Sequence, residues 1–444
     1  MTNALKTEPV AGLEIGTSKI CIAVAEQVEG GFNLLGLGQS RSRGVRKGEI
    51  IAPAQVEEDV RDALSEAEQM ADVKIRSVFL GVTGGHLCRL THFEAIKFSS
   101  CHEISANDIE QWLNRTPAVK LPDGYQIIHN LPQRFVVNGK NGGGNPIGTM
   151  ASRMRVVRHV IYGHASRLQK TIHLLHAMNL NVDCLVFNGI AASQALLTPE
   201  DKASGALVID LGGGATEFVV YIDGLIQLSG VLPVGGDHVS NDLAYGLKIP
   251  LNRAEKLKVE QGSALVTDQA KFLQFFITNE YGVEIKPDNV EYREHIMSVR
   301  VAEIFEFIAR QLKEADLTDW LRAGVFLCGG GARTPGILSL AKRIFPMKVA
   351  LGRIRPVGGL SAALDQPEFA TAIGLAQYGL PQNRPGFETI PPPPPLGYGD
   401  PVPLPMGISG RFSNTVPALY DGEDLDVPTF VRQGDPEITH DLPS

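Results

Sequence analysis

Three glycine-containing turns, each preceded by a short apolar run, constrain the fold of this chain most strongly. They lie at residues 14–19 (EIGTSK), 210–217 (DLGGGATE) and 328–332 (CGGGA). The first two also lead into a second apolar run, so each predicts a β-hairpin. Glycine lets several backbone N–H groups approach one phosphate. The two hairpins therefore predict a phosphate-binding cleft between two similar domains, with the third turn leaving room for a nucleoside.

Polar side chains beside these turns are candidate ligands for ATP and Mg²⁺. The hydroxyls of Thr17, Ser18 and Thr216 and the charge of Lys19 could contact phosphate oxygens. Glu14 and Asp210 are expected at strand ends, where a carboxylate can hold Mg²⁺ directly or through water. The other predicted nucleotide contacts are Gly16, Gly212, Gly213, Gly214, Gly329, Gly330, Gly331 and Ala332. For any single turn the alternative is a flexible loop, and the pattern matches neither a Walker A loop nor a Rossmann fingerprint.

Composition narrows the class of protein. A chain of 444 residues is expected to form two or more domains. The net charge of −8 argues against nucleic-acid binding. Five cysteines without a CxxC spacing indicate reduced thiols and a cytoplasmic protein. No apolar run is long enough to span a membrane, and the first ten residues lack the apolar core of a signal peptide.

The last 64 residues differ from the rest of the chain. Residues 381–444 hold half of the 28 prolines and an excess of acidic over basic side chains. Such a composition buries too little apolar surface to form a packed domain. We predict a disordered, proline-rich, acidic tail.

Apolar periodicity places strands and helices alternately along the remaining chain, which predicts an α/β fold. Residues 83–159 interrupt the first domain with three strand-like stretches and one helix and are expected to form an inserted α+β subdomain. The predicted helices cover about 53–70, 105–115, 165–178, 189–197, 239–245, 253–261, 292–314, 335–344 and 369–378.

Four short motifs resemble the FtsA family of the actin/Hsp70/sugar-kinase superfamily. They are residues 12–19 (GLEIGTSK), 129–135 (HNLPQRF), 145–148 (NPIG) and 254–258 (AEKLK). The resemblance implies a two-domain actin-like ATPase fold with an inserted subdomain, called 1C. The implied divisions are 1A at 10–82, 161–204 and 369–380, 1C at 83–160, 2A at 205–234 and 322–368, 2B at 235–321, and the tail at 381–444.

The resemblance also implies a function. FtsA-like proteins are polymerising, ATP-dependent division adaptors that self-assemble through 1C and bind the C-terminal peptide of FtsZ through 2B. They link the Z-ring to the membrane and to septal wall proteins, on the cytoplasmic side of the inner membrane. Glu255 and Lys258 match the residues that reach ribose and adenine, and Arg300 and Glu303 match the peptide contacts. The alternative for each pair is a solvated helix surface.

Two departures from the family pattern modify these expectations. Residues 187–192 offer no carboxylate to orient an attacking water, and Asn188 is a weak candidate for that role. ATP hydrolysis is therefore expected to be weak, if the chain is an enzyme at all. The tail has no lysine beyond residue 381, and its prolines exclude a long amphipathic helix. Direct membrane binding is accordingly not expected, and partners would provide the anchor.

A third departure is a peptide motif within the tail. Residues 424–435 (DLDVPTFVRQGD) resemble the C-terminal peptide of FtsZ, which an FtsA-like protein would bind. It could occupy the chain's own 2B site, within one molecule or along a filament, or it could compete with FtsZ or recruit other proteins. The alternative is chance similarity. The candidate contact residues are Leu425, Asp426, Val427, Pro428, Phe430, Val431 and Arg432.

Two other functions remain open at this point. A sugar or acid kinase of the same superfamily would need an aspartate base in the first domain, and the sequence offers no convincing candidate. A pilus-assembly relative would share the fold and also bind a partner peptide. The tail motif and residues 129–135 favour division.

Overall fold

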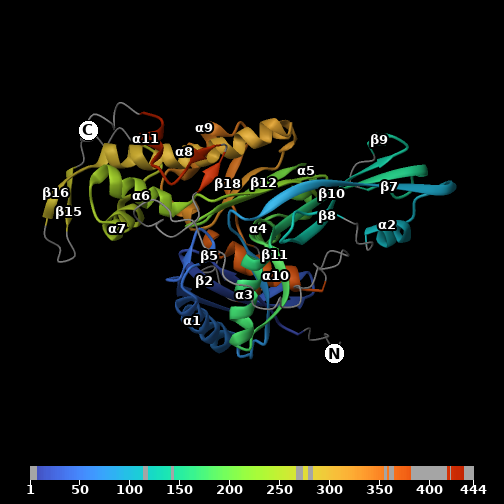
Figure 1. Cartoon of the computed structure of the whole chain (residues 1–444), viewed down its shortest axis with the longest axis horizontal. Helices are drawn as coiled ribbons and strands as arrows, with labels where there is room; N and C mark the ends of the chain where they lie inside the picture. The colour runs from blue at the N-terminus through green and yellow to red at the C-terminus, as the bar shows by residue number, and fades with distance from the viewer. Residues whose placement is uncertain are drawn as a thin grey trace.

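The computed structural model describes residues 8–113, 119–141, 145–266, 274–278, 284–354, 358–359, 365–381, 418–420 and 422–434 (Figure 1). Among these residues, no helix combines the length and the apolar character that a membrane crossing requires. Most of the predicted disordered tail lies outside the described residues. Two short pieces of it are described, and both pack on the body of the protein.

The first half of the chain builds a six-stranded sheet in the order β11-β6-β1-β2-β3-β19. Strands β1, β2 and β3 form an antiparallel meander, β6 and β11 extend the sheet in parallel from β1, and β19 pairs in parallel with β3. The strand bounds are β1 Val10–Ile15, β2 Lys19–Val28, β3 Gly31–Arg41, β6 Ser77–Val82, β11 Asn181–Phe187 and β19 Gly358–Gly359. A two-stranded hairpin of β4 (Val45–Arg46) and β5 (Glu49–Ile50) follows β3.

The second half repeats this arrangement. Its five-stranded sheet has the order β14-β13-β12-β17-β18, again with three antiparallel strands followed by two parallel ones. The bounds are β12 Ala206–Leu211, β13 Thr216–Ile222, β14 Leu225–Leu232, β17 Gly324–Cys328 and β18 Val349–Leu351. The repeated topology confirms the predicted pair of similar domains.

Helices cover both faces of both sheets (Figure 1). Apolar residues of α1 and α3 pack on one face of the first sheet. Helices α4 and α10 lie between the two sheets, so that one core joins both halves. Helices α6, α8 and α9 pack on the outer face of the second sheet. The bounds are α1 Pro53–Ala71, α3 Ala165–Ala177, α4 Asn188–Leu196, α5 Pro199–Ser204, α6 Gly236–Leu247, α7 Leu251–Gln261, α8 Val290–Glu314, α9 Ile337–Ile344 and α10 Ala370–Gly379.

An inserted sheet projects from the side of the molecule (Figure 1). Its order is β7-β10-β8-β9, and it carries a small core of its own together with α2. The bounds are β7 Cys88–Glu103, α2 Ala106–Leu113, β8 Tyr125–Val137, β9 Lys140–Asn141 and β10 Met150–His164. A separate hairpin of β15 (Gln274–Thr278) and β16 (Glu284–Asn289) precedes α8.

The described part of the tail lies against α8 (Figure 1). It consists of a two-residue pairing of β20 (Leu419–Tyr420) with β21 (Glu423–Asp424) and one helical turn, α11 (Thr429–Arg432). Ala418, Leu425 and Phe430 are fully buried and belong to the same core as α6 and α8. Within the proline-rich tail, this segment therefore packs as part of the second domain.

Candidate functional site

A cavity of about 530 Å³ opens between the two sheets. This volume lies within the range of small-molecule sites. The three predicted glycine turns line the cavity from both halves of the molecule. The described lining includes, from the predictions, Glu14, Gly16, Thr17, Ser18, Lys19, Asn188, Asp210, Gly212, Gly213, Gly214, Glu255, Lys258, Gly329, Gly330 and Gly331.

The first two turns have the same local geometry. The Gly16 N–H donates to the Lys19 carbonyl at 3.0 Å, and the Gly212 N–H donates to the Ala215 carbonyl at 3.0 Å. A Cβ atom at Gly16 or Gly212 would lie 2.7 Å from the oxygen that accepts this bond. Each hairpin therefore requires glycine at the corresponding position.

The two halves approach each other closely at Gly214. A Cβ atom there would collide with the hydroxyl of Thr17 and would lie 2.7 Å from the backbone nitrogen of Lys47. The Thr17 hydroxyl also accepts a hydrogen bond of 3.0 Å from the Gly48 N–H. The second phosphate turn thus packs against the first turn and against the β4–β5 hairpin, with little spare space.

Three carboxylates lie at the base of the cleft. Burial, followed by repulsion from Glu14, raises the pKa of Asp210 to about 6. Burial and the charges of Asp210 and Glu14 raise the pKa of Glu217 well above its usual range. Asp210 accepts a hydrogen bond of 2.5 Å from Thr371, Glu217 accepts one from Thr83, and Glu14 pairs with Lys19 at 3.2 Å. Sequence reasoning missed Glu217, which sits one position after a predicted contact.

The carboxylates at the base of the cleft suit a cation that takes its other ligands from phosphate oxygens and water. Among the described residues, no three His, Cys, Asp or Glu side chains come together closely enough to hold a metal by themselves. Mg²⁺ in nucleotide sites is held by one or two carboxylates, phosphate oxygens and water. Burial and the nearby Glu14 carboxylate raise the pKa of Asp210, and a cation bound at this point would favour its ionised form. Asp210 and Glu14 therefore fit Mg²⁺ bound together with a phosphate ligand.

The other end of the cleft carries Glu255 and Lys258 on one face of α7. Lys258 donates to Glu255 at 2.9 Å and to the carbonyl of Gly236 at 2.9 Å. The hydroxyl of Ser240 donates to the same Glu255 oxygen at 2.5 Å. The pair is held against α6 and also lines the cavity, which makes it more than a solvated surface pair. Apolar side chains of Val239, Met297 and Ile304 line the cavity beside it.

The structure places two of the predicted nucleotide contacts, Thr216 and Ala332, outside the described lining of the cavity. The hydroxyl of Thr216 donates to the carbonyl of Val234 at 2.8 Å, and its side chain is fully buried. Thr216 is the first residue of β13, and this bond ties its hydroxyl to the segment that follows β14. Ala332 is 1% exposed and packs in the core of the second domain, outside the described lining of the cavity.

Asn188 lies at the start of α4 and lines the cavity, as the prediction of a water-positioning residue requires. Its side chain is 5% exposed, and its Oδ1 atom has no hydrogen-bond partner among the described residues. A buried amide oxygen of this kind needs a partner. It can accept a hydrogen bond from a water molecule, but an amide is a poor base.

A second site lies on α8, where Arg300 and Glu303 are both buried. The Arg300 guanidinium forms two hydrogen bonds to Asp242 of α6, at 2.7 and 2.9 Å, and one to Glu303 at 3.1 Å. Its remaining contacts are the carbonyls of Leu425 and Val427 in the tail, at 3.0 and 2.9 Å. A solvated helix surface is thereby ruled out for this pair.

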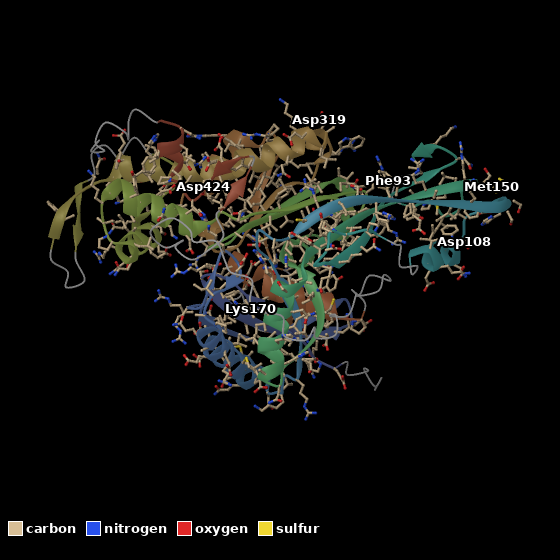
Figure 2. The ribbon with its side chains drawn as sticks, in the orientation of Figure 1. Phe93, Asp108, Met150, Lys170, Asp319 and Asp424 are labelled. Carbon is tan, nitrogen blue, oxygen red and sulfur yellow. The ribbon has the colours of Figure 1, made fainter. Side chains whose placement is uncertain are left out.

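The tail segment packs between side chains of α6 and α8, which form its groove. Figure 2 labels Asp424 of this segment beside the two helices. The Thr429 hydroxyl donates to Glu303 at 2.9 Å, and Arg432 donates to both Glu303 oxygens at 2.6 and 2.8 Å. The Phe430 ring is fully buried, 6.1 Å from the ring of Tyr245. Of the predicted tail contacts, Leu425, Asp426, Pro428 and Phe430 are buried, whereas Val427, Val431 and Arg432 are half-buried.

Comparison with known proteins matches this arrangement. A family model described as cell division protein FtsA matches residues 207–374, and one described as the SHS2 domain inserted in FtsA matches residues 84–162. The cell division protein FtsA of Pseudomonas aeruginosa is 30% identical over 392 residues, which cover 87% of this chain and 93% of the relative. FtsA of Neisseria meningitidis is 31% identical over 368 residues, covering 82% and 89%.

Among solved structures, the type IV pilus biogenesis complex PilM–PilN aligns with a TM-score of 0.59. The alignment covers 84% of this chain and 98% of that chain at 17% identity, which supports the shared actin-like fold alone. The curated relatives extend over nearly the whole described body, including both sheets and the inserted subdomain. The chain belongs to the FtsA family of cell division proteins.

Proposed function

We propose that this protein is an ATP-binding, polymerising division adaptor that binds the C-terminal peptide of FtsZ and links the Z-ring to the membrane and the septal wall machinery. The observation that carries the proposal is the groove on α8. It holds a peptide with an acidic residue, a proline, an aromatic residue and an arginine in the order that resembles FtsZ. A groove that accepts this pattern from its own tail has the chemistry to accept it from a partner.

ATP with Mg²⁺ is the ligand proposed for the cleft. The paired glycine turns would supply backbone N–H groups to a phosphate, and Lys19 would supply a positive charge there. Burial alone would lower the pKa of Lys19, but the pairing with Glu14 outweighs burial and the net pKa is raised. The amine is therefore charged. Glu14 and Asp210 would hold the metal, and Glu255 and Lys258 would contact the nucleoside.

Polymerisation is proposed to use the inserted subdomain. Phe93, Ile147 and Met150 are exposed apolar side chains of this subdomain, at 55%, 47% and 53%. Figure 2 shows Phe93 and Met150 along the projecting sheet, away from the second domain's groove. Apolar side chains that are exposed along one projecting element offer area that a partner could cover. They support a head-to-tail contact with another copy of the chain.

Hydrolysis is proposed to be slow, with ATP acting mainly as an assembly ligand. Asn188 can hold a water molecule, and no carboxylate stands beside it in the 187–192 segment. A measured turnover above about 1 per second, the low end of ordinary enzyme rates, would contradict this proposal. The protein would act at the division site on the cytoplasmic side of the inner membrane, anchored through partners.

Peptide binding tests the proposal directly. The full chain carrying Phe430→Asp would free its own groove, because a carboxylate cannot occupy that fully buried position unpaired. We expect a labelled C-terminal peptide of the same organism's FtsZ to bind this variant, and we expect a further Glu303→Gln change to weaken binding. Absence of binding with and without ATP would remove the adaptor proposal's main support.

A further inference from the structure

The tail segment reaches beyond the groove on α8 and contacts the first domain. We propose that residues 418–434 are a built-in ligand that bridges the mouth of the nucleotide cleft, through a pocket for Asp426 formed by Lys47 and His238. Displacement of this ligand by a partner peptide would then be linked to the nucleotide in the cleft. This linkage rests on the proposed nucleotide binding, whereas the Asp426 pocket does not.

The Asp426 carboxylate joins the two halves of the molecule. Its Oδ2 atom accepts a hydrogen bond of 2.6 Å from Lys47 of the first domain, and its Oδ1 atom lies 3.2 Å from His238 Nε2 of α6. The N–H of Ala418 adds a contact of 3.3 Å to Oδ2. The exposed fractions of the Asp426, Lys47 and His238 side chains are 4%, 6% and 0%. This pocket is therefore a buried acid-binding site. Asp426 is among the predicted tail contacts, but Lys47 and His238 are not.

The hydrogen bonds of His238 fix its form. Burial lowers the pKa of this imidazole to about 4, so it is neutral near pH 7. Its Nδ1 atom accepts a hydrogen bond of 3.2 Å from the Gly235 N–H. The proton consequently sits on Nε2, which donates to Asp426. Gly235 lines the nucleotide cavity, so this chain of bonds runs from the cavity wall to the tail.

Lys47 provides the corresponding connection in the first domain. It sits at the turn between β4 and β5 with φ of 49°, and its backbone packs against Gly214 of the second phosphate turn. The following residue, Gly48, lines the cavity and bonds to the Thr17 hydroxyl. A nucleotide held by both glycine turns would keep the two domains close together. A tail held by both Lys47 and His238 favours the same arrangement of the domains.

The charges explain why the bridge is selective for an acid. Burial lowers the pKa of Lys47, although Asp426 acts to raise it. Burial also acts to raise the pKa of Asp426, but the hydrogen bonds from His238 and Lys47 outweigh it and hold this pKa below its usual range. A buried ion pair that loses one member leaves the other without its counter-charge. A neutral residue at position 426 should therefore weaken docking strongly.

The covalent tether favours the internal ligand over a free peptide. An intramolecular ligand acts at an effective concentration of the order of millimolar. A partner peptide of similar pattern must exceed this advantage, which a high local density of partner tails can do. A ligand that bridges both domains also responds to nucleotide, because coupling between two sites is reciprocal.

A double-mutant cycle tests the pocket in the full chain. The Phe430→Asp variant is titrated with labelled peptides of residues 418–434, either unchanged or carrying Asp426→Asn. We expect the Asn peptide to bind about tenfold more weakly or worse, as for other buried charge-assisted pairs. Adding Lys47→Met should reduce this difference to about twofold, and Lys47→Arg should restore much of it. Lys74→Met, a change of an exposed lysine on the same domain, should leave it intact.

The nucleotide arm repeats the titrations with saturating ATP and Mg²⁺, whose binding is measured separately with a fluorescent ATP analogue. We expect nucleotide to tighten the unchanged peptide at least about fivefold, and Lys47→Met to abolish this effect. If Asp426→Asn weakens peptide binding equally in proteins with and without Lys47, the proposed pocket is wrong. An intact pocket without a nucleotide effect would overturn the linkage. Failure of the analogue to bind would contradict the proposed cleft ligand, while the peptide cycle would still decide the pocket.

Discussion

The nucleotide cleft and the tail groove of this protein owe their shapes to different groups of the chain. The cleft is shaped by backbone, because the turns at Gly16, Gly212 and Gly214 leave no space for a Cβ atom. The groove is shaped by side chains, because Arg300, Asp242 and Glu303 form a buried network that the tail completes. The cleft should therefore be sensitive to added volume and the groove to lost charge.

The largest effect is expected in the groove from Arg300→Ala. The change would leave the buried carboxylate of Asp242 without its guanidinium and would remove one of the two arginines that contact Glu303, which costs about 3–5 kcal/mol in comparable buried pairs. Denaturant unfolding and proteolysis of the tail would measure the loss. Arg310→Ala on the same helix removes an exposed arginine that lies over Phe307, and it should cost less than about 1 kcal/mol. Equal losses of stability in both variants would contradict the claim that the buried charge network holds the groove.

Added volume should act on the cleft even without a ligand. Gly214→Ala would place its Cβ atom against the Thr17 hydroxyl and 2.7 Å from the Lys47 backbone, and overpacking of this kind costs about 1–3 kcal/mol. Gly330→Ala is the matched control, since its Cβ atom would meet nothing within 4 Å. Thermal unfolding without nucleotide should separate the two variants. Similar stabilities would show that the turns can relax and that the cleft is not fixed by backbone packing.

The pH dependence of metal binding sharpens the comparison at the carboxylates of the cleft. Mg²⁺ takes the ionised form of Asp210, whose pKa is raised to about 6, so binding expels a proton when the pH lies below 6. Between pH 7 and pH 5 the affinity for Mg²⁺ with ATP should fall by about tenfold through this group. Calorimetry on the Asp210→Asn variant measures how the affinity changes with pH when only the nucleotide titrates. If the unaltered protein shows the same change with pH, Asp210 is not a metal contact.

The smallest effect is expected at the nucleoside end. Lys258→Met removes a donor that also holds Glu255 and the Gly236 carbonyl, and ATP affinity should fall about fivefold, as for the loss of about 1 kcal/mol. Lys256→Met, on the same helix, removes a lysine whose side chain is 55% exposed and which pairs with Glu260 at 3.7 Å. A fluorescent ATP analogue should show no change for this control. If both variants lose the same ATP affinity, the loss comes from the change in net charge and not from a contact of Lys258.

The cleft could largely be predicted from sequence because its requirements are local. A glycine turn after a strand, or Glu255 and Lys258 one helical turn apart, can be found in a few neighbouring residues. Sequence could not decide the direction of a side chain that has two possible partners. Thr216 bonds to Val234 of the neighbouring segment, and neither its residue type nor its spacing distinguishes this bond from a phosphate contact.

The groove could be predicted only in part because its partners are distant in sequence. Helix α8 has an apolar stripe that places Arg300 and Glu303 off the core-facing side, yet both are buried once the tail covers them. The tail motif indicated a peptide for this helix but not Lys47, which lies 379 positions from Asp426. Asp242 carried no local signal, since only the Arg300 geometry explains its burial.

Hydrogen exchange of residues 418–434 in the intact chain tests the central claim that the tail occupies the protein's own groove. The amides of Leu425 and Gln433 donate within the segment, to Ala418 and Thr429, at 2.8 and 2.9 Å. They should exchange slowly in the unaltered protein and fast in the Phe430→Asp variant. Exchange of the unaltered tail at the rate of an unfolded chain would contradict the claim.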